Sequence, residues 1–243
     1  MNYPSAQTHI SSTQRNGHRF YLVAGHTLPS VTTILSVIAK PALIPWARNT
    51  VLETVRRSLL KLQGAPIPPA LLDAVIEDAR RSPHKVMAQA ADFGTKAHAL
   101  IAAILQGEKP EIPPELAPAI ESFKAWQKNA GLDIEFAETE VRSLAHGYAG
   151  TLDALACRGD RWVVLDWKTG NGIYPEHALQ VAAYAKAFEE TVGVKVGEAW
   201  IIRLGKTSPT FNAQQVMDIE AAFGTFLAVL GLWRGLQEME EVC

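Results

Sequence analysis

The spacing of apolar residues changes near residue 131, and this change constrains the fold of the 243-residue chain more than any other feature. Between residues 30 and 130 the apolar residues recur at helical spacing, interrupted by proline and glycine. After residue 131 they form short strand-like runs separated by turn residues, and then alternate between helix and strand. This order predicts an α/β (α+β) fold with a mostly helical N-terminal part.

The expected elements follow from these patterns. A strand is expected at 19–23, and a helix entry at 29–35 with Ser30 as its N-cap. Further helices are predicted over 45–61, 70–81, 84–105 and 113–131, with Ser82-Pro83 separating the second from the third. Strands are predicted over 134–141, 148–156, 161–166 and 194–204, and helices over 175–192 and 213–240. We expect a single domain of residues 1–243, with 30–130 as its helical part and 131–243 as the sheet core with the C-terminal helix.

Composition excludes several classes of protein. The first 20 residues contain no apolar segment of a secretory signal, and no uninterrupted apolar run reaches the ~18 residues expected of a membrane span. The chain has two cysteines, Cys157 and Cys243, too few for a disulfide framework or a four-cysteine metal site. We therefore expect a cytoplasmic protein with reduced thiols, no membrane association and no iron–sulfur cluster.

The net charge of −2 conceals an asymmetry between two parts of the chain. Residues 1–96 carry 11 Lys/Arg and 5 Asp/Glu, whereas residues 97–243 carry 12 and 20. The basic part could bind phosphates and the acidic part cations, although two ordinary solvated surfaces would give the same count. The candidate phosphate contacts are Arg48, Arg56, Arg57, Arg80, Arg81, Lys85 and Lys96.

Two neighbouring predicted strands carry the residues of greatest chemical interest. Asp166 and Lys168 are two apart on a strand, so their side chains point to the same face of the sheet. A turn at 158–160 would fold this strand against the preceding one and bring Asp153 near Asp166. Two carboxylates and the main-chain carbonyl of Trp167 would form an oxygen-rich site suited to Mg²⁺ or Mn²⁺. A lysine beside them could orient or deprotonate an attacking water.

In these motifs the chain resembles the RecB-like branch of the PD-(D/E)XK superfamily of nucleases. The resemblance covers about residues 19–204, and its early segments are similar to phage-type and mitochondrial genome maintenance exonucleases. It rests on Gly150-Thr151-Leu152-Asp153, Asp166-Trp167-Lys168-Thr169, Gln180 with Tyr184, Gly94-Thr95-Lys96-Ala97-His98, and Pro29-Ser30-Val31-Thr32-Thr33-Ile34-Leu35 with Trp46. A central mixed sheet flanked by helices is the fold that this resemblance implies.

The resemblance also implies a role for each matching residue. Asp153, Asp166, the Trp167 carbonyl and His98 would bind the metal, and Lys168 would be the catalytic lysine. Gln180 and Tyr184 share a helix face and would line the site. Glu138 resembles a recurring glutamate of the family whose role is open, and Glu140 is an alternative.

The implied activity is metal-dependent hydrolysis of DNA, most simply by an exonuclease of phage or prophage type acting on single- or double-stranded ends. A structure-specific endonuclease, a non-catalytic DNA-end-binding protein and a metal-free interaction protein remain alternatives. The chain has no G-x-x-x-x-G-K-[ST] motif, so any unwinding would need a helicase or recombination partner, whose identity the sequence does not give.

Overall fold

The structure is a computed structural model that describes residues 11–15, 17–62 and 66–242. The chain divides into two compact units, each considered by itself. The sheet unit consists of Met1–Ile38 with Lys96–Cys243, and the helical unit consists of Ala39–Thr95. The long helix α3, Pro69–Leu105, contributes residues to both units.

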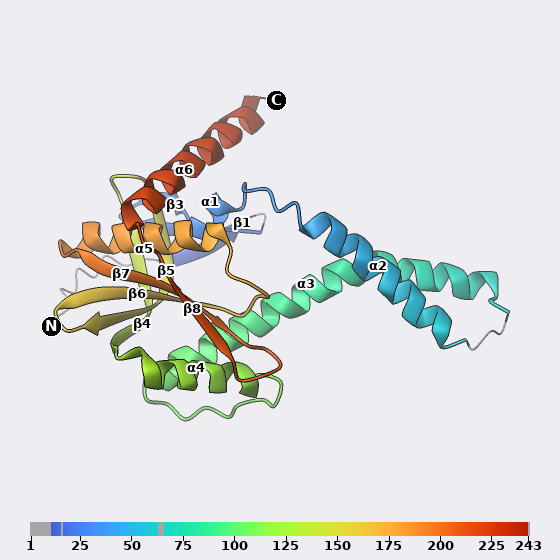
Figure 1. The fold of residues 1–243 in the computed structure, drawn as a ribbon. Helices are drawn as coiled ribbons and strands as arrows, with labels where there is room; N and C mark the ends of the chain where they lie inside the picture. Colours follow the sequence, from blue (N-terminus) through green and yellow to red (C-terminus); the bar gives the residue numbers. More distant parts are fainter. Residues whose placement is uncertain (1–10, 16, 63–65, 243) are drawn as a thin grey trace. The chain divides into compact units, whose positions relative to one another are not determined.

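A five-stranded sheet forms the centre of the sheet unit. Its strands are β4 (Asp133–Ser143), β5 (Tyr148–Arg158), β6 (Arg161–Lys168), β7 (Val196–Leu204) and β8 (Phe211–Gln215), in the spatial order β4-β5-β6-β7-β8. Neighbouring strands are antiparallel except β6 and β7, which are parallel and are joined by helix α5, Pro175–Val192. The expected mixed sheet flanked by helices is therefore confirmed (Figure 1).

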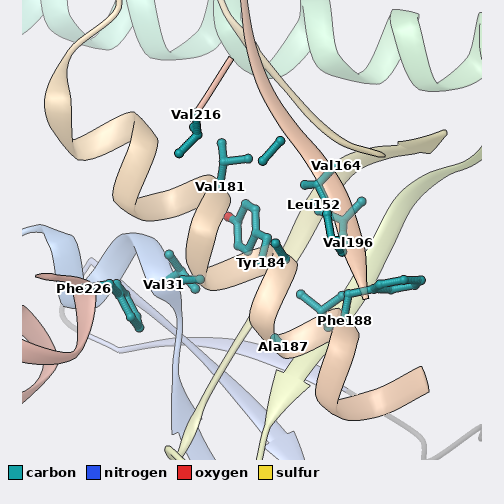
Figure 2. Close-up of a cluster of buried hydrophobic side chains, with 14 of the residues drawn as sticks. Val31, Leu152, Val164, Val181, Tyr184, Ala187, Phe188, Val196, Val216 and Phe226 are labelled. Atoms are coloured by element: carbon teal, nitrogen blue, oxygen red, sulfur yellow. The ribbon is translucent and has the colours of Figure 1, made fainter. Parts of the chain in front are cut away.

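Helices cover both faces of this sheet. On one face, Val181, Tyr184 and Phe188 of α5 pack into an apolar cluster with strand residues, and Phe226 of helix α6, Ile219–Val242, joins the same cluster (Figure 2). On the other face, helix α4, Ala117–Ala130, packs two aromatic side chains against Trp167 of β6. Burial on both faces explains why β5 and β6 are almost continuously apolar, and why the polar residues among them are informative.

A smaller sheet precedes these elements. Strands β1 (Ser11–Arg15), β2 (His18–Val23) and β3 (His26–Pro29) are antiparallel, and the short helix α1 (Val31–Leu35) follows. The predicted N-cap is confirmed, because the Ser30 hydroxyl accepts a hydrogen bond from the main-chain N–H of Thr33. Strand β1 is not predicted by apolar spacing, because all five of its residues are polar and exposed.

The helical unit contains helix α2, Leu43–Leu60, and the first part of α3. The prediction that Ser82-Pro83 separates two helices is wrong, since α3 continues through Pro83. Proline lacks the N–H that would bond the Ala79 carbonyl. The Ser82 hydroxyl instead donates to that carbonyl at 2.7 Å, so the helix keeps its acceptor satisfied.

The last predicted helix also begins later than expected. Residues 211–215 form the edge strand β8, which pairs with β7, and α6 begins only at Ile219. Pairing with a neighbouring strand outweighs the local helical pattern here. By length and composition alone, α6 could cross a membrane, although a core helix of a soluble protein passes the same test. Its Phe226 and Leu230 are buried in the apolar cluster beneath α5.

Candidate active site

Two carboxylates meet where β5 and β6 run side by side. The antiparallel register pairs Ala154 with Leu165, so Asp153 and Asp166 are the next residues opposite each other. The main-chain N–H of Trp167 donates to Asp153 Oδ2 at 2.7 Å, which fixes this carboxylate beside β6. The hairpin that the sequence predicts thus brings the two aspartates together, with the Trp167 peptide between them.

A histidine from a distant helix completes this part of the site. His98 lies on α3, 55 residues before Asp153, and its Nδ1 is 3.0 Å from Asp153 Oδ1. Both residues belong to the sheet unit, so their contact lies within one compact unit. The imidazole therefore lies beside the carboxylates, as the upstream motif leads us to expect.

Lys168 lies two residues after Asp166 on β6 and contacts its carboxylate. Its Nζ is 2.7 Å from Asp166 Oδ2 and donates to Gln180 Oε1 at 3.0 Å. Gln180 Nε2 in turn donates to the Tyr184 hydroxyl at 3.0 Å, so three side chains form a chain of hydrogen bonds leading to the lysine. A Cβ at Gly150 would lie 2.4 Å from the Tyr184 ring, so glycine is needed there to accommodate this tyrosine.

Glu138 is the residue whose position the sequence leaves open. It lies on β4 with φ of 49°, a left-handed conformation that is rare for residues other than glycine, asparagine and aspartate. One ligand atom each from His98, Glu138 and Asp153 lie within 4.8 Å of one another. Among the described residues the structure thus groups Glu138, and not Glu140, with the histidine and aspartate. A strained backbone at one position has no signature in the spacing of apolar residues.

The charges in this cluster shift the pKa values of its members in different directions. Burial raises the pKa of Asp166 to about 6, and the Asp153 charge adds to the rise against the opposing effect of Lys168. Burial also raises the pKa of Asp153, but the charge and hydrogen bond of His98, with Lys168 and the Trp167 N–H, outweigh it and leave a lowered value. Burial lowers the pKa of His98, but Asp153 outweighs it and the net shift is upward.

The donor set of this cluster fits a divalent cation. Asp166 is only 1% exposed, and its Oδ2, despite the nearby lysine, has no partner with hydrogen-bond geometry in the described part of the chain. Carboxylate oxygens and one imidazole nitrogen are ligands that Mg²⁺ or Mn²⁺ accepts. His98, Glu138, Asp153 and Asp166 could supply them, together with the carbonyl of Trp167.

A buried carboxylate without its cation should weaken the fold. Since Asp166 has a pKa of about 6 in the protein and an ordinary value of 3.8, its ionisation opposes folding above pH 6. Without divalent ions at pH 7, we expect Asp166→Asn to raise the free energy of unfolding by roughly 1–3 kcal/mol. The gain should shrink as pH falls through 6 and vanish below about pH 4, where wild-type Asp166 is protonated in both states.

Denaturation in chelator between pH 4 and pH 8 measures this difference. Asp160→Asn is the matched control, because Asp160 is an exposed carboxylate in the turn between β5 and β6. Equal stability of the Asp166→Asn variant and wild type across this pH range would show that Asp166 ionisation does not oppose folding.

The predicted phosphate contacts are spread over both units. Lys96 lies in the sheet unit, two residues before His98, and the other six lie in the helical unit. Four of these six are exposed and form ion pairs with acidic neighbours: Arg56 with Glu53, Arg80 and Arg81 with Glu77, and Lys85 with Asp78. Exposed ion pairs of this kind contribute little to stability and separate easily. Their presence is therefore no evidence for or against phosphate binding by these residues.

Comparison with protein families gives one match. Residues 115–240 match the PD-(D/E)XK nuclease superfamily. Among solved structures, the chain is similar to that of SSO0001, with 13% identity and a TM-score of 0.37 over 76% of this chain and 84% of that one. It is also similar to an alkaline exonuclease (LHK-Exo) from Laribacter hongkongensis, with 15% identity and a TM-score of 0.32 over 61% and 84%. No curated protein matches the sequence. The family match spans more than half of the chain and includes β5, β6 and α5, and the chain therefore belongs to the PD-(D/E)XK nuclease superfamily.

Proposed function

We propose that this protein is a Mg²⁺- or Mn²⁺-dependent exonuclease that hydrolyses phosphodiester bonds at DNA ends. Nucleases of this superfamily use divalent metals, and DNA is the substrate that the family implies. The observation that carries the proposal is the convergence of Asp153, Asp166 and Lys168 on the neighbouring strands β5 and β6 with His98 of α3, each within hydrogen-bond or ion-pair distance of a neighbour in the site. An ion pair that served stability alone would not require two acidic groups and a histidine with ligand atoms within 4.8 Å of one another.

Each residue has a role in this proposal that follows from its contacts. His98, Glu138, Asp153, Asp166 and the Trp167 carbonyl would hold the cation, which would polarise the phosphate and lower the pKa of a water when bound. Lys168 offsets the charge that develops on the phosphate and orients the attacking water. Gln180 holds the lysine amine in place, and Tyr184 holds the amide of Gln180. Buried as it is, the Tyr184 hydroxyl has a raised pKa and stays protonated.

Preference for ends, and a role in recombination, repair or degradation of phage or prophage type, extend this proposal. They are supported by the likeness of the early motifs to phage-type exonucleases and not by the metal cluster. An endonuclease that cuts branched DNA would use the same cluster, so the two activities differ only in how DNA reaches it.

Digestion of DNA labelled at either end tests the proposal. We expect Mn²⁺ or Mg²⁺ to support release of labelled mononucleotides or short products from linear DNA, and chelator to abolish it. A covalently closed circle is the matched control, because an exonuclease cannot degrade it. Cleavage of the circle would favour the endonuclease alternative. Binding of DNA ends without cleavage in either metal would favour the non-catalytic alternative.

A further inference from the structure

The first of the two sheets lies against the active-site strand β5. The Tyr21 hydroxyl on β2 is 2.9 Å from the Thr151 hydroxyl, two residues before Asp153. Tyr21 and Val23 are buried together with Ala149 of β5. One face of β2 therefore packs on the strand that carries Asp153, within the sheet unit.

Arg19 shares this face of β2 and lies toward the metal cluster. Side chains of a strand alternate, so Arg19 points to the same side as Tyr21. Ser30, after β3, forms a parallel bridge with Ala149, and β2 runs antiparallel to β3. Strand β2 is therefore antiparallel to β5. Arg19 follows Tyr21 in the same direction as Asp153 follows Thr151, so Arg19 lies on the Asp153 side of Tyr21.

The backbone of Arg19 is held by the motif at residues 29–35, which the proposed function leaves without a role. The Thr33 hydroxyl accepts from the Arg19 N–H and donates to the Arg19 carbonyl, both at 3.0 Å. The Ser30 N–H also donates to this carbonyl at 3.0 Å. Ser30 at the same time caps α1, so the motif joins β2 to a helix that packs in the main core. These hydrogen bonds fix the main chain at Arg19, and therefore the position from which its side chain extends.

The side chain itself is exposed, and within the described residues no carboxylate lies within ion-pair distance of it. Its positive charge nevertheless acts on Glu138 of the metal cluster. Burial and the Asp153 charge raise the pKa of Glu138, whereas the charges of His98 and Arg19 lower it. A cation that faces an acidic metal site without pairing with it is available to an anionic ligand.

We propose that Arg19 binds a phosphate of the DNA backbone next to the one that is cleaved. This inference rests on the proposed function, because it takes the substrate to be DNA held at the metal cluster. A guanidinium can contact two phosphate oxygens at once, so it fixes the position of a backbone better than an ammonium does. Arg19 is thus a substrate-binding residue on β2, outside the motifs of β5, β6 and α5.

Equilibrium binding of a fluorescent oligonucleotide, single-stranded and as a blunt duplex, tests this role. Anisotropy is measured in Ca²⁺, chosen to slow hydrolysis, between about 50 and 200 mM salt. Loss of one phosphate contact should make the slope of log K against log salt shallower by about 0.7–0.9. We expect Arg19→Gln to show this change and to weaken binding about tenfold. Arg19→Lys should keep most of the slope while losing part of the affinity.

Arg15→Gln is the matched control. Arg15 is an exposed arginine of the same small sheet, but it pairs with His18 and so points to the face opposite Arg19. We expect it to leave both affinity and slope unchanged.

Two other outcomes are distinguishable. If Arg19 only offsets the charge of Glu138, Arg19→Gln would alter the Mn²⁺ concentration needed for cleavage but leave the salt slope at the wild-type value, and the phosphate contact would be wrong. If wild-type protein neither binds nor cleaves DNA, the proposed function itself fails, whatever the variants do.

Discussion

Lys168→Ala should lower the rate of DNA cleavage by a factor on the order of 10³ while leaving Mn²⁺ affinity close to that of the wild type. The amine lies 2.7 Å from Asp166 Oδ2 and is held by Gln180, so it faces the place where a bound phosphate and water would meet. Its removal has two opposing effects on the cation. It takes away a repelling positive charge, but it also raises the pKa of Asp166 further, because Lys168 normally lowers it.

The rate is measured with excess labelled DNA at saturating Mn²⁺, and the metal affinity by calorimetry at pH 8, where Asp166 is ionised in the wild type. Lys195→Ala is the matched control, since Lys195 is an exposed lysine just before β7. Its neighbour Val196 pairs with Trp162 near the start of β6, away from the end that carries Asp166 and Lys168. A Lys168→Ala enzyme that cleaves at the wild-type rate would exclude the lysine from the chemistry.

The residues on β5 and β6 could be placed together from the sequence because their geometry is local. A two-residue spacing places Asp166 and Lys168 on one face of any strand. A short turn after Arg158 favours a hairpin, and the register of that hairpin aligns Asp153 with Asp166. The same locality explains why α5 is found where it was predicted, at Pro175–Val192, with proline in its first turn.

What sequence spacing could not give depends on the tertiary structure. The position of His98 beside Asp153 follows from how α3 packs, and only the resemblance of its motif pointed to it. The orientation of the Glu138 side chain depends on the left-handed backbone conformation of Glu138 itself, within β4. Residues 211–215 form strand β8 because they pair with β7. Helix α3 continues through Pro83 because the Ser82 hydroxyl replaces the missing hydrogen bond to the Ala79 carbonyl. In each case a neighbour decides the outcome against the local preference.

Asp153→Asn should lower Mn²⁺ affinity by at least about 100-fold and abolish measurable cleavage, more than the 10–100-fold typical of residues that only support metal ligands. Asp153 lies between His98 and the Trp167 N–H, and its lowered pKa keeps it ionised and ready to bind a cation at neutral pH. Asparagine has the same shape and can still accept the Trp167 hydrogen bond, so the protein should fold. Calorimetric titration of Mn²⁺ measures the loss, and the exposed turn variant Asp160→Asn should bind like the wild type.

His98→Ala should affect cleavage differently with the two ions that the site could use. Mg²⁺ is the harder ion and relies on oxygen ligands, whereas imidazole nitrogen is better suited to transition metals. We therefore expect the variant to lose Mn²⁺-supported cleavage by about 10–100-fold and Mg²⁺-supported cleavage by less. Because His98 and Asp153 contact each other, the Asp153→Asn, His98→Ala double variant should be little worse in Mn²⁺ affinity than Asp153→Asn alone. Wild-type Mn²⁺ affinity in both single variants would mean that the cation, if one binds, is held elsewhere. Equal losses with the two ions would instead assign His98 to orienting the Asp153 carboxylate through their 3.0 Å contact, and not to binding the metal.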